Sequence, residues 1–339
     1  MDEYNAAPAQ DSHAIIAAKR KALRPAKTDT HITILVPVYN EEEAITSFLN
    51  AVCPRLDAEL CRYTITFIND GSQDNTLGLL LAAAKSNAQI SVINLTRNFG
   101  KEAALTAGLD QCDADAVIVM DVDLQDPPQL ISQFIAHWRE GYDIVYGKRV
   151  ARKTDSFLKR WTAKKFYQAF NSVSSVEIPD NVGDFRLIDR RVVEAMGTLK
   201  ERNRFMKGLF AWVGYPAIAV PYERPQREAG ATKFGFGRLW NFALDGIFGF
   251  STFPLKAWTY FGLCVAFGAA LYAGIIFIRT LVFGIDVPGY ASLMIAVLAM
   301  SSAQLISLGI IGEYLARITL ETKQRPNYLI ENHYKDEAS

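Results

Sequence analysis

The 339-residue sequence has no excess of either charge, because 36 lysines and arginines balance 36 aspartates and glutamates. Without a net positive charge the chain has no general attraction for nucleic acid, so we expect no nucleic-acid partner and look for anion affinity in local clusters. Cysteine is also scarce, and the four residues, Cys53, Cys61, Cys112 and Cys264, show no CxxC spacing. This predicts neither a zinc site nor a disulfide framework, and the four histidines likewise share no metal-ligand spacing.

The first 30 residues lack the features of a signal peptide. Asp2 and Glu3 stand where a basic segment would be needed, and no long apolar run follows them. We therefore expect residues 1–30 to form an N-terminal extension ahead of the first domain.

Charge is absent from two long runs near the C-terminus, 257–278 and 287–312. Each reaches the roughly 20 residues that a helix needs to cross a bilayer. We predict a two-helix transmembrane hairpin over 255–314 and a cytoplasmic tail over 315–339. The substrate of a domain tethered in this way can itself be a lipid.

The orientation of this hairpin follows from its flanking charges. Lysine and arginine precede the first run and follow the second, at Arg238, Lys256, Arg317, Lys323 and Arg325, whereas residues 280–289 contain neither. Positively charged flanks stay on the cytoplasmic side. The sequence therefore predicts a multi-pass protein of the lipid bilayer with both termini and the preceding domain in the cytoplasm.

Before the hairpin, strand-like runs alternate with helical ones over 31–235. Apolar, β-branched runs at 32–38, 63–68, 91–95, 116–120 and 143–146 predict strands, and residues 101–109 predict a helix between two of them. This alternation predicts an α/β fold with a mostly parallel, doubly wound sheet, whose ligands bind at the carboxyl ends of the strands.

Two further segments are predicted to lie at the membrane surface. Residues 157–173 mix aromatic and basic side chains, a composition suited to an anionic leaflet. Residues 236–254 place apolar side chains at helical spacing directly before the first span, which predicts a juxtamembrane amphipathic helix. The alternative for both segments is packing on the preceding domain, and the position of the second directly before the span favours the membrane surface.

The most specific local chemistry follows the run 116–120, where the chain reads Asp121-Val122-Asp123-Leu124-Gln125. Two carboxylates one residue apart after a strand, with an amide oxygen beside them, suit a hard divalent cation such as Mg²⁺ or Mn²⁺. An Asp-x-Asp motif also occurs in ordinary surface turns. The preceding strand and the following Gln-Asp-Pro-Pro favour the metal site.

Several motifs together resemble those of inverting family 2 glycosyltransferases with a GT-A, Rossmann-like fold. They are Val36-Pro-Val-Tyr-Asn-Glu-Glu, Asn69-Asp-Gly-Ser, Thr96-Arg-Asn-Phe-Gly-Lys-Glu, Asp121-Val-Asp-Leu-Gln-Asp-Pro and Gly183-Asp-Phe-Arg-Leu. With Glu201-Arg-Asn-Arg-Phe-Met-Lys-Gly, Thr232-Lys-Phe, Ser251-Thr-Phe-Pro-Leu and two terminal spans, the series is similar to the bactoprenol glucosyltransferases of O-antigen modification. The resemblance covers about residues 31–330.

This resemblance implies roles for individual residues in binding a nucleotide sugar. Base, ribose and donor contacts would come from Pro37, Tyr39, Glu41, Asp70, Asn98, Lys101 and Asp121. The family usually has Asp-Asp-Gly-Ser where this chain has Asn69, so only Asp70 is assigned to the uracil. Asp121, Asp123 and Gln125 would bind the metal and, through it, the diphosphate.

The resemblance further implies transfer of glucose from UDP-glucose to undecaprenyl phosphate at the inner membrane of a bacterium. Asp184 is the position that the family nominates as catalytic base; orienting the sugar hydroxyls or holding Arg186 are alternative roles. An acceptor phosphate beside a diphosphate also needs cations. The candidates are Lys148, Arg149, Arg152, Arg204, Arg227 and Lys233. Related enzymes further suggest a homotetramer.

Other functions remain open at this point. The same reaction could use UDP-4-deoxy-4-formamido-arabinose, UDP-N-acetylglucosamine or GDP-mannose as donor. A different class is a membrane scaffold or flippase partner without catalysis. Intact Asp121, Asp123, Gln125 and Asp184 argue against that class, as do two spans free of intramembrane charge.

Overall fold

The computed structural model describes residues 15–21, 24, 29–59, 61–150, 182–199, 201, 204, 206–223, 253–283 and 289–335. The chain divides into two compact units. The first contains the sheet and, after the second unit, takes up the chain again from Pro326. The second contains two long helices.

The first unit is built on one eight-stranded sheet. Its strands are β1 (His31–Val38), β2 (Arg62–Asn69), β3 (Ile90–Leu95), β4 (Ala116–Val119), β5 (Ile144–Arg149), β6 (Val182–Asp189), β7 (Ala217–Tyr222) and β8 (Ile330–Tyr334). Their order across the sheet is β7-β5-β6-β4-β1-β2-β3-β8. The five strands expected from the sequence are all present, so the α/β fold is confirmed.

The sheet is mixed rather than uniformly parallel. β1 pairs in parallel with β2 and β4, β2 with β3, and β5 with β7. β6 runs antiparallel to β4 and β5, and β8 runs antiparallel to β3. The central strands of the sheet are parallel and covered on both faces, which explains why their sequences are mostly apolar. All six residues of β3 are buried.

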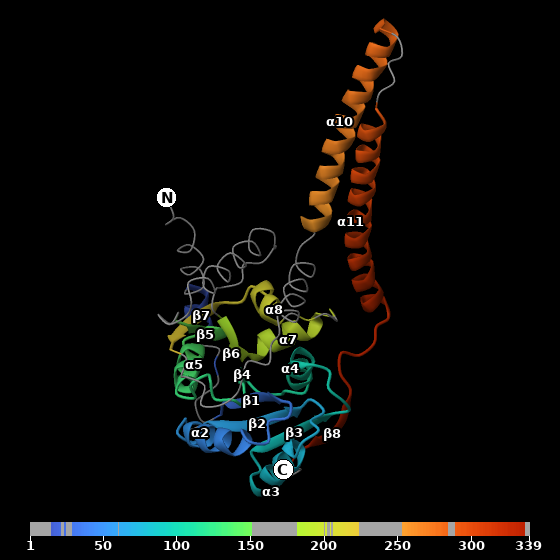
Figure 1. Cartoon of the computed structure of the whole chain (residues 1–339). Helices are drawn as coiled ribbons and strands as arrows, with labels where there is room; N and C mark the ends of the chain where they lie inside the picture. The colour runs from blue at the N-terminus through green and yellow to red at the C-terminus, as the bar shows by residue number, and fades with distance from the viewer. Residues whose placement is uncertain are drawn as a thin grey trace. The chain divides into compact units, whose positions relative to one another are not determined.

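Helices cover both faces of this sheet. They are α2 (Ile45–Asp57), α3 (Thr76–Ser86), α4 (Lys101–Asp110), α5 (Leu130–Arg139), α7 (Arg190–Thr198) and α8 (Met206–Trp212). Helices α2 and α3 lie on one face of the β1-β2-β3 region, and α4 and α7 lie on the other (Figure 1). Helix α2 buries Ile45, Phe48, Val52 and Leu56 along one stripe, and the Phe48 ring meets Phe67 edge-on at 5.8 Å.

Part of the expected N-terminal extension packs on this unit. Ala17 is buried, and Arg24 donates to the carbonyl oxygen of Trp138 at 2.9 Å and to the Asp143 carboxylate at 3.0 Å. Arg20 also pairs with Asp143, which is completely buried. A buried carboxylate needs such partners, so the described part of the extension contributes to the fold.

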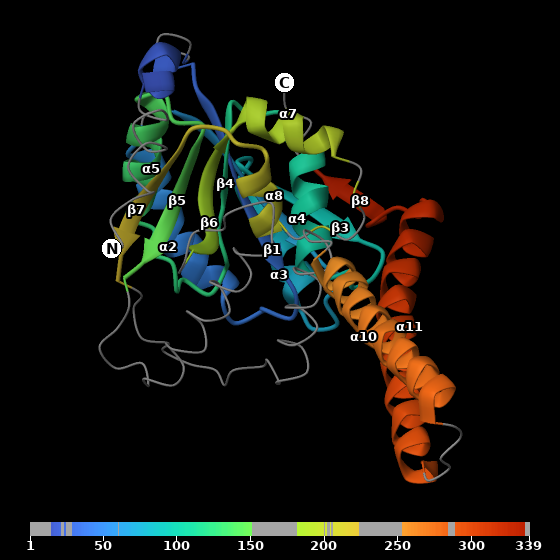
Figure 2. The same cartoon turned by 90° about the horizontal axis from the view of Figure 1, so that it is seen from above.

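The second unit contains α10 (Phe253–Phe283) and α11 (Tyr290–Thr322), which run side by side in both views (Figures 1 and 2). Within the described residues, one stretch, Ala299–Thr322 of α11, is long and apolar enough to cross a membrane. The first predicted span, 257–278, falls within α10 and stays a prediction. Helix α11 continues to Thr322, beyond the expected end of the hairpin at residue 314.

Candidate active site

Three charged side chains from separate elements meet at one edge of the sheet. Lys101 is the first residue of α4, Asp121 follows the end of β4, and Asp184 lies in β6. The Nζ atom of Lys101 lies 2.6 Å from Oδ1 of Asp121 and 2.6 Å from Oδ2 of Asp184. One ammonium therefore bridges two carboxylates that the sequence analysis assigned to different tasks.

The bridge shifts the titration of its members. Burial alone lowers the pKa of Lys101, but Asp121 and Asp184 outweigh it and raise that pKa above its usual value. Burial raises the pKa of Asp184, yet Lys101 and Lys207 outweigh it and hold the pKa well below its usual range. Asp184 is consequently ionised at neutral pH and is a weak base.

Two side chains that the sequence analysis did not select complete the surroundings of Asp184. Lys207 of α8 places its Nζ 4.0 Å from Oδ1 of Asp184. Glu102, beside Lys101, accepts a hydrogen bond from the backbone N–H of Met206 at 3.3 Å, which ties α4 to the start of α8. Burial, reinforced by the charge of Asp184, raises the pKa of Glu102 to about 7.

Arg186 does not serve as a free cation for a substrate. It is 3% exposed, donates to the carbonyl oxygen of Gly183 at 2.8 Å, and lies over the Phe210 ring at 4.0 Å. Its guanidinium is buried between the backbone of β6 and the Phe210 ring. It therefore supports β6 rather than presenting a guanidinium to solvent.

The second carboxylate of the Asp-x-Asp motif is held by its own turn. Leu124 adopts a positive φ of 53°, and the backbone N–H of Gln125 donates to Oδ1 of Asp123 at 3.1 Å. The side-chain amide of Gln125 donates to the other oxygen at 2.5 Å. Asp123 itself is exposed, while Gln125 is buried. Gln125 thus orients Asp123, a contact that the metal-ligand assignment did not anticipate.

These donors fit a hard divalent cation. Among the described residues, no group of three or more His, Cys, Asp or Glu side chains is arranged to hold a metal. Mg²⁺ is normally held by one or two carboxylates together with substrate phosphates, so two carboxylates of one turn match that chemistry. Asp121 and Asp123 are the residues that would hold it, with Gln125 behind Asp123.

Asp70 organises the loop that leads into α4. Its two carboxylate oxygens accept the backbone N–H groups of Phe99 at 2.7 Å and Gly100 at 2.9 Å. Gly71 has a φ of 66°, and a Cβ there would lie 2.5 Å from the backbone nitrogen of Asn98. Only glycine permits this approach, which brings the ends of β2 and β3 together. The expected uracil contact of Asp70 stays a prediction.

The loop after β1 meets the loop after β2 through side-chain bonds to backbone. The Ser72 hydroxyl accepts the N–H of Asn40 at 3.0 Å, and the Asn40 side chain accepts the N–H of Gln73 at 2.8 Å. Tyr39 is 41% exposed beside them, Pro37 lies within β1, and the N–H of Glu41 donates to the Thr76 hydroxyl. Four of the predicted nucleotide contacts therefore lie at the ends of two neighbouring strands: Pro37, Tyr39 and Glu41 at the end of β1, and Asp70 after β2.

The side chains predicted to bind phosphate differ in whether other protein groups already engage them. Arg149 donates to the Tyr222 hydroxyl at 3.0 Å and pairs with buried Asp126 at 3.5 Å, so part of its guanidinium is engaged. Arg204 donates to the carbonyl oxygen of Leu199 at 2.7 Å, while Lys148 is exposed. Arg152, Arg227 and Lys233 lie outside the described residues, as do the predicted surface helix at 157–173 and residues 236–252 of the one predicted at 236–254.

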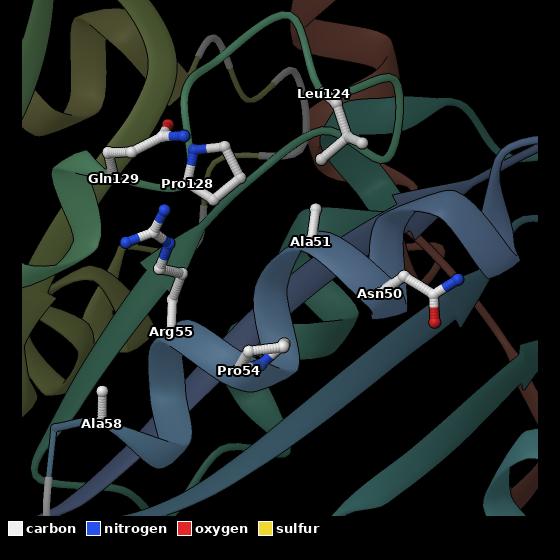
Figure 3. A pocket seen from close by; sticks show the side chains of 8 residues that line it. All are labelled: Asn50, Ala51, Pro54, Arg55, Ala58, Leu124, Pro128 and Gln129. Carbon is white, nitrogen blue, oxygen red and sulfur yellow. The ribbon is translucent and has the colours of Figure 1, made fainter.

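A surface pocket of about 440 Å³ opens beside the Asp-x-Asp turn, between α2 and residues 124–129 (Figure 3). It is lined by Asn50, Ala51, Pro54, Arg55, Ala58, Leu124, Pro128 and Gln129. None of the predicted site residues lines it. The pocket and the charged cluster of Lys101, Asp121 and Asp184 therefore lie at different places.

Comparisons with known proteins agree with the motif series. The profile of the glycosyl transferase family 2 matches residues 33–197. An uncharacterized glycosyltransferase of Synechocystis is 50% identical over 301 residues, covering 89% of this chain and 95% of the relative. A bactoprenol glucosyl transferase of Shigella phage SfV is also 50% identical over 301 residues, covering 89% and 98%. Both similarities extend past the end of the family profile.

Among solved structures, mannosyl-3-phosphoglycerate synthase from Rubrobacter xylanophilus is similar with a TM-score of 0.45 and 16% identity. The match covers 68% of this chain and 74% of that one.

Proposed function

This chain belongs to glycosyl transferase family 2, and on that premise we propose that it transfers glucose from UDP-glucose to undecaprenyl phosphate. The observation that carries the proposal is the 50% identity to a bactoprenol glucosyl transferase over 89% of the chain and 98% of that relative. The charged cluster of Lys101, Asp121 and Asp184 supports it, because it would supply a metal-binding carboxylate and a fixed positive charge beside the diphosphate.

In this reaction a phosphate oxygen of the acceptor attacks C1 of glucose, a new C1–O bond forms, and the bond from C1 to UDP breaks. In-line attack inverts the configuration at C1 and gives a β-linked lipid product. The main electrostatic demand is the charge that develops on departing UDP. A bound Mg²⁺ or Mn²⁺ would neutralise that charge. Asp121 and Asp123 would hold the ion, with Gln125 fixing the orientation of Asp123.

Asp184 acts in this scheme as a positioning residue. The acceptor phosphate is already anionic near neutral pH, so it needs no strong base to attack. The low pKa of Asp184 makes it a poor proton acceptor, while its two oxygens face Lys101 and Lys207. Asp184 would therefore hold both ammonium groups beside the reacting phosphates, a role that differs from the base and from the two alternatives considered from the sequence.

The membrane assignment belongs to the same proposal. Ala299–Thr322 of α11 has the length and apolarity of a span, and α10 would provide the second. Together they would anchor a cytoplasmic catalytic unit at the bacterial inner membrane, where the acceptor's phosphate lies. Assembly as a homotetramer is an additional expectation from related enzymes.

The test is transfer of radiolabelled sugar to undecaprenyl phosphate by the purified full-length protein in proteoliposomes. UDP-glucose should label the lipid in the presence of Mn²⁺ or Mg²⁺, and EDTA should abolish the labelling. A panel with UDP-N-acetylglucosamine, UDP-4-deoxy-4-formamido-arabinose and GDP-mannose serves as the matched control. Labelling by one of these donors but not by UDP-glucose would overturn the choice of sugar. Absence of metal-dependent UDP binding would favour a scaffold.

A further inference from the structure

The chain returns to the catalytic unit after α11 and adds β8 to the edge of the sheet. β8 pairs antiparallel with β3, and the register shifts where Asn94 faces Asn332 but Leu95 faces Ile330. Glu331 is the extra residue in this irregularity. A bulge of this kind redirects a side chain. Here Oε2 of Glu331 accepts a hydrogen bond from the side-chain nitrogen of Asn94 at 2.7 Å.

From Glu331 a chain of hydrogen bonds runs inward to the strand ends. Oδ1 of Asn94 accepts from the side-chain nitrogen of Asn69 at 2.7 Å. Oδ1 of Asn69 accepts from the backbone N–H of Ser72 at 3.3 Å, and the Ser72 hydroxyl accepts the N–H of Asn40. Asn94 is 5% exposed and Asn69 is 1% exposed. We call the series from Glu331 to Asn40 the amide relay.

The two ends of the relay fix the orientation of the side-chain amides of Asn94 and Asn69. A carboxylate accepts and never donates, so Glu331 requires Asn94 to turn its NH₂ outward and its oxygen inward. Asn69 must then donate to Asn94 and is left with its oxygen facing the donating N–H of Ser72. Reversing either amide would set two donors or two acceptors against each other inside the protein, where unpaired polar groups are costly.

We propose that Glu331 is a positioning residue for nucleotide binding, because it sets the orientation of Asn94 and Asn69 and thereby shapes the loops after β1 and β2. Those loops carry Tyr39 and Asp70, so the inference rests on the proposed function of these loops in holding the nucleotide. An aspartate at position 69 would face the inward oxygen of Asn94, so the relay requires asparagine there.

The first test replaces Glu331 by glutamine, whose amide accepts either orientation of Asn94. In proteoliposomes, Glu331→Gln should raise the KM for UDP-glucose about fivefold, as expected when a charge-assisted hydrogen bond becomes a neutral one that no longer fixes Asn94, with kcat and the acceptor KM unchanged. Backbone hydrogen exchange at Ser72 and Asn40, measured by mass spectrometry without substrates, should accelerate in the same variant.

The decisive variant is Glu331→Gln combined with Asn94→Asp. The carboxylate introduced on β3 accepts from both sides, so it holds Asn69 in its native orientation, and the amide introduced on β8 can donate to it. The double variant should return the KM and the exchange rates to within about twofold of wild type. The exchange also restores the bond between β8 and β3, so the Asn69→Asp variants are needed to separate amide orientation from docking of β8.

Asn69→Asp gives an independent check. It should weaken UDP binding more in the wild-type background than in the Glu331→Gln background, where Asn94 is free to turn around. Tyr328→Phe is the matched control. Tyr328 lies on the same returning segment as Glu331, and loss of its hydroxyl removes the 2.8 Å hydrogen bond to Asp110 but leaves the relay intact. It should leave the nucleotide KM unchanged.

Unchanged hydrogen exchange in Glu331→Gln, or failure of Asn94→Asp to rescue it, would overturn the relay. Hydrogen exchange needs neither turnover nor acceptor, so this result is separate from the fate of the proposed function. A wild-type protein that transfers no glucose would end the proposed function while the exchange measurements still judge the relay. Altered exchange with an unaltered affinity for UDP would remove its role in nucleotide binding.

Discussion

The ammonium of Lys101 lies 2.6 Å from a carboxylate oxygen of Asp184, although 83 residues separate them. The same ammonium contacts Asp121, so removal of Lys101 would leave two carboxylates facing one another. If Asp121 also binds a metal, as proposed, the metal and the Lys101 ammonium would both neutralise these carboxylates, and loss of the lysine charge should change the effect of the metal on stability.

Lys101→Met should lower kcat by about 10²-fold, because it removes a fixed positive charge from the place where charge develops. It should also lower the melting temperature in EDTA, since Asp121 and Asp184 then repel each other. Added Mn²⁺ should raise the melting temperature more in the variant than in wild type. Thermal unfolding with and without metal measures this, and exposed Lys85→Met is the control. An equal response to metal in both proteins would contradict the shared site.

Asp123→Ala should abolish turnover, by about 10³-fold or more, while folding and membrane insertion remain intact. The carboxylate is exposed, so its loss removes a metal ligand rather than core packing. Gln125→Ala should cause a smaller loss of about tenfold, because Asp123 then loses the side-chain donor that orients it. Radiolabel transfer and thermal unfolding check both. Full activity in Asp123→Ala would remove that residue from the mechanism.

Asp184→Asn should reduce kcat by about 10²-fold without altering the shape of the kcat–pH profile between about pH 5 and 8. The pKa of Asp184 lies well below its usual range, so it does not titrate in that window. A catalytic base would instead produce an acid limb that disappears in the variant. Measuring the profile for both proteins therefore separates positioning from proton transfer.

Glu102 makes stability depend on pH in the opposite direction from Asp184. Its folded pKa of about 7 lies above the ordinary value of 4.5, so its contribution is full below pH 4.5 and is lost as the pH rises through about 7. Glu102→Gln should remove this loss. The melting temperature of the variant relative to wild type should thus increase from about pH 5 to about pH 8. A difference that stays constant with pH would refute the shifted pKa.

Local sequence patterns predicted much of the catalytic unit. Five strand runs appear where apolar, β-branched residues predicted them, because the parallel centre is buried on both faces. β6, β7 and β8 were not anticipated, and β6 and β8 bring in the antiparallel pairing of the described sheet. Pairing partners are set by contacts distant in sequence, which a strand pattern alone does not specify.

The candidate site shows the same division. Lys101, Asp121 and Asp184 were selected by motif, yet their common contact depends on how α4, β4 and β6 meet. Glu102 and Lys207 lie inside motifs quoted from the sequence, but nothing in their spacing indicated that both lie near Asp184. Glu331 gave no signal at all, since its role arises from a bulge in a strand pair.

The span predicted over the first uncharged run, 257–278, can be tested through Cys264, an exposed residue of α10. If α10 crosses the bilayer, this thiol lies in hydrocarbon, out of reach of a membrane-impermeant reagent. In a variant that retains only Cys264, a membrane-impermeant maleimide should fail to label intact proteoliposomes and should label after denaturation in detergent. Lys335→Cys in the same background is the matched control, because Lys335 is exposed after β8 and should label in proteoliposomes whose catalytic unit faces outward. Rapid labelling of Cys264 in intact vesicles would show that α10 does not span and that the membrane anchor must be sought in α11 alone.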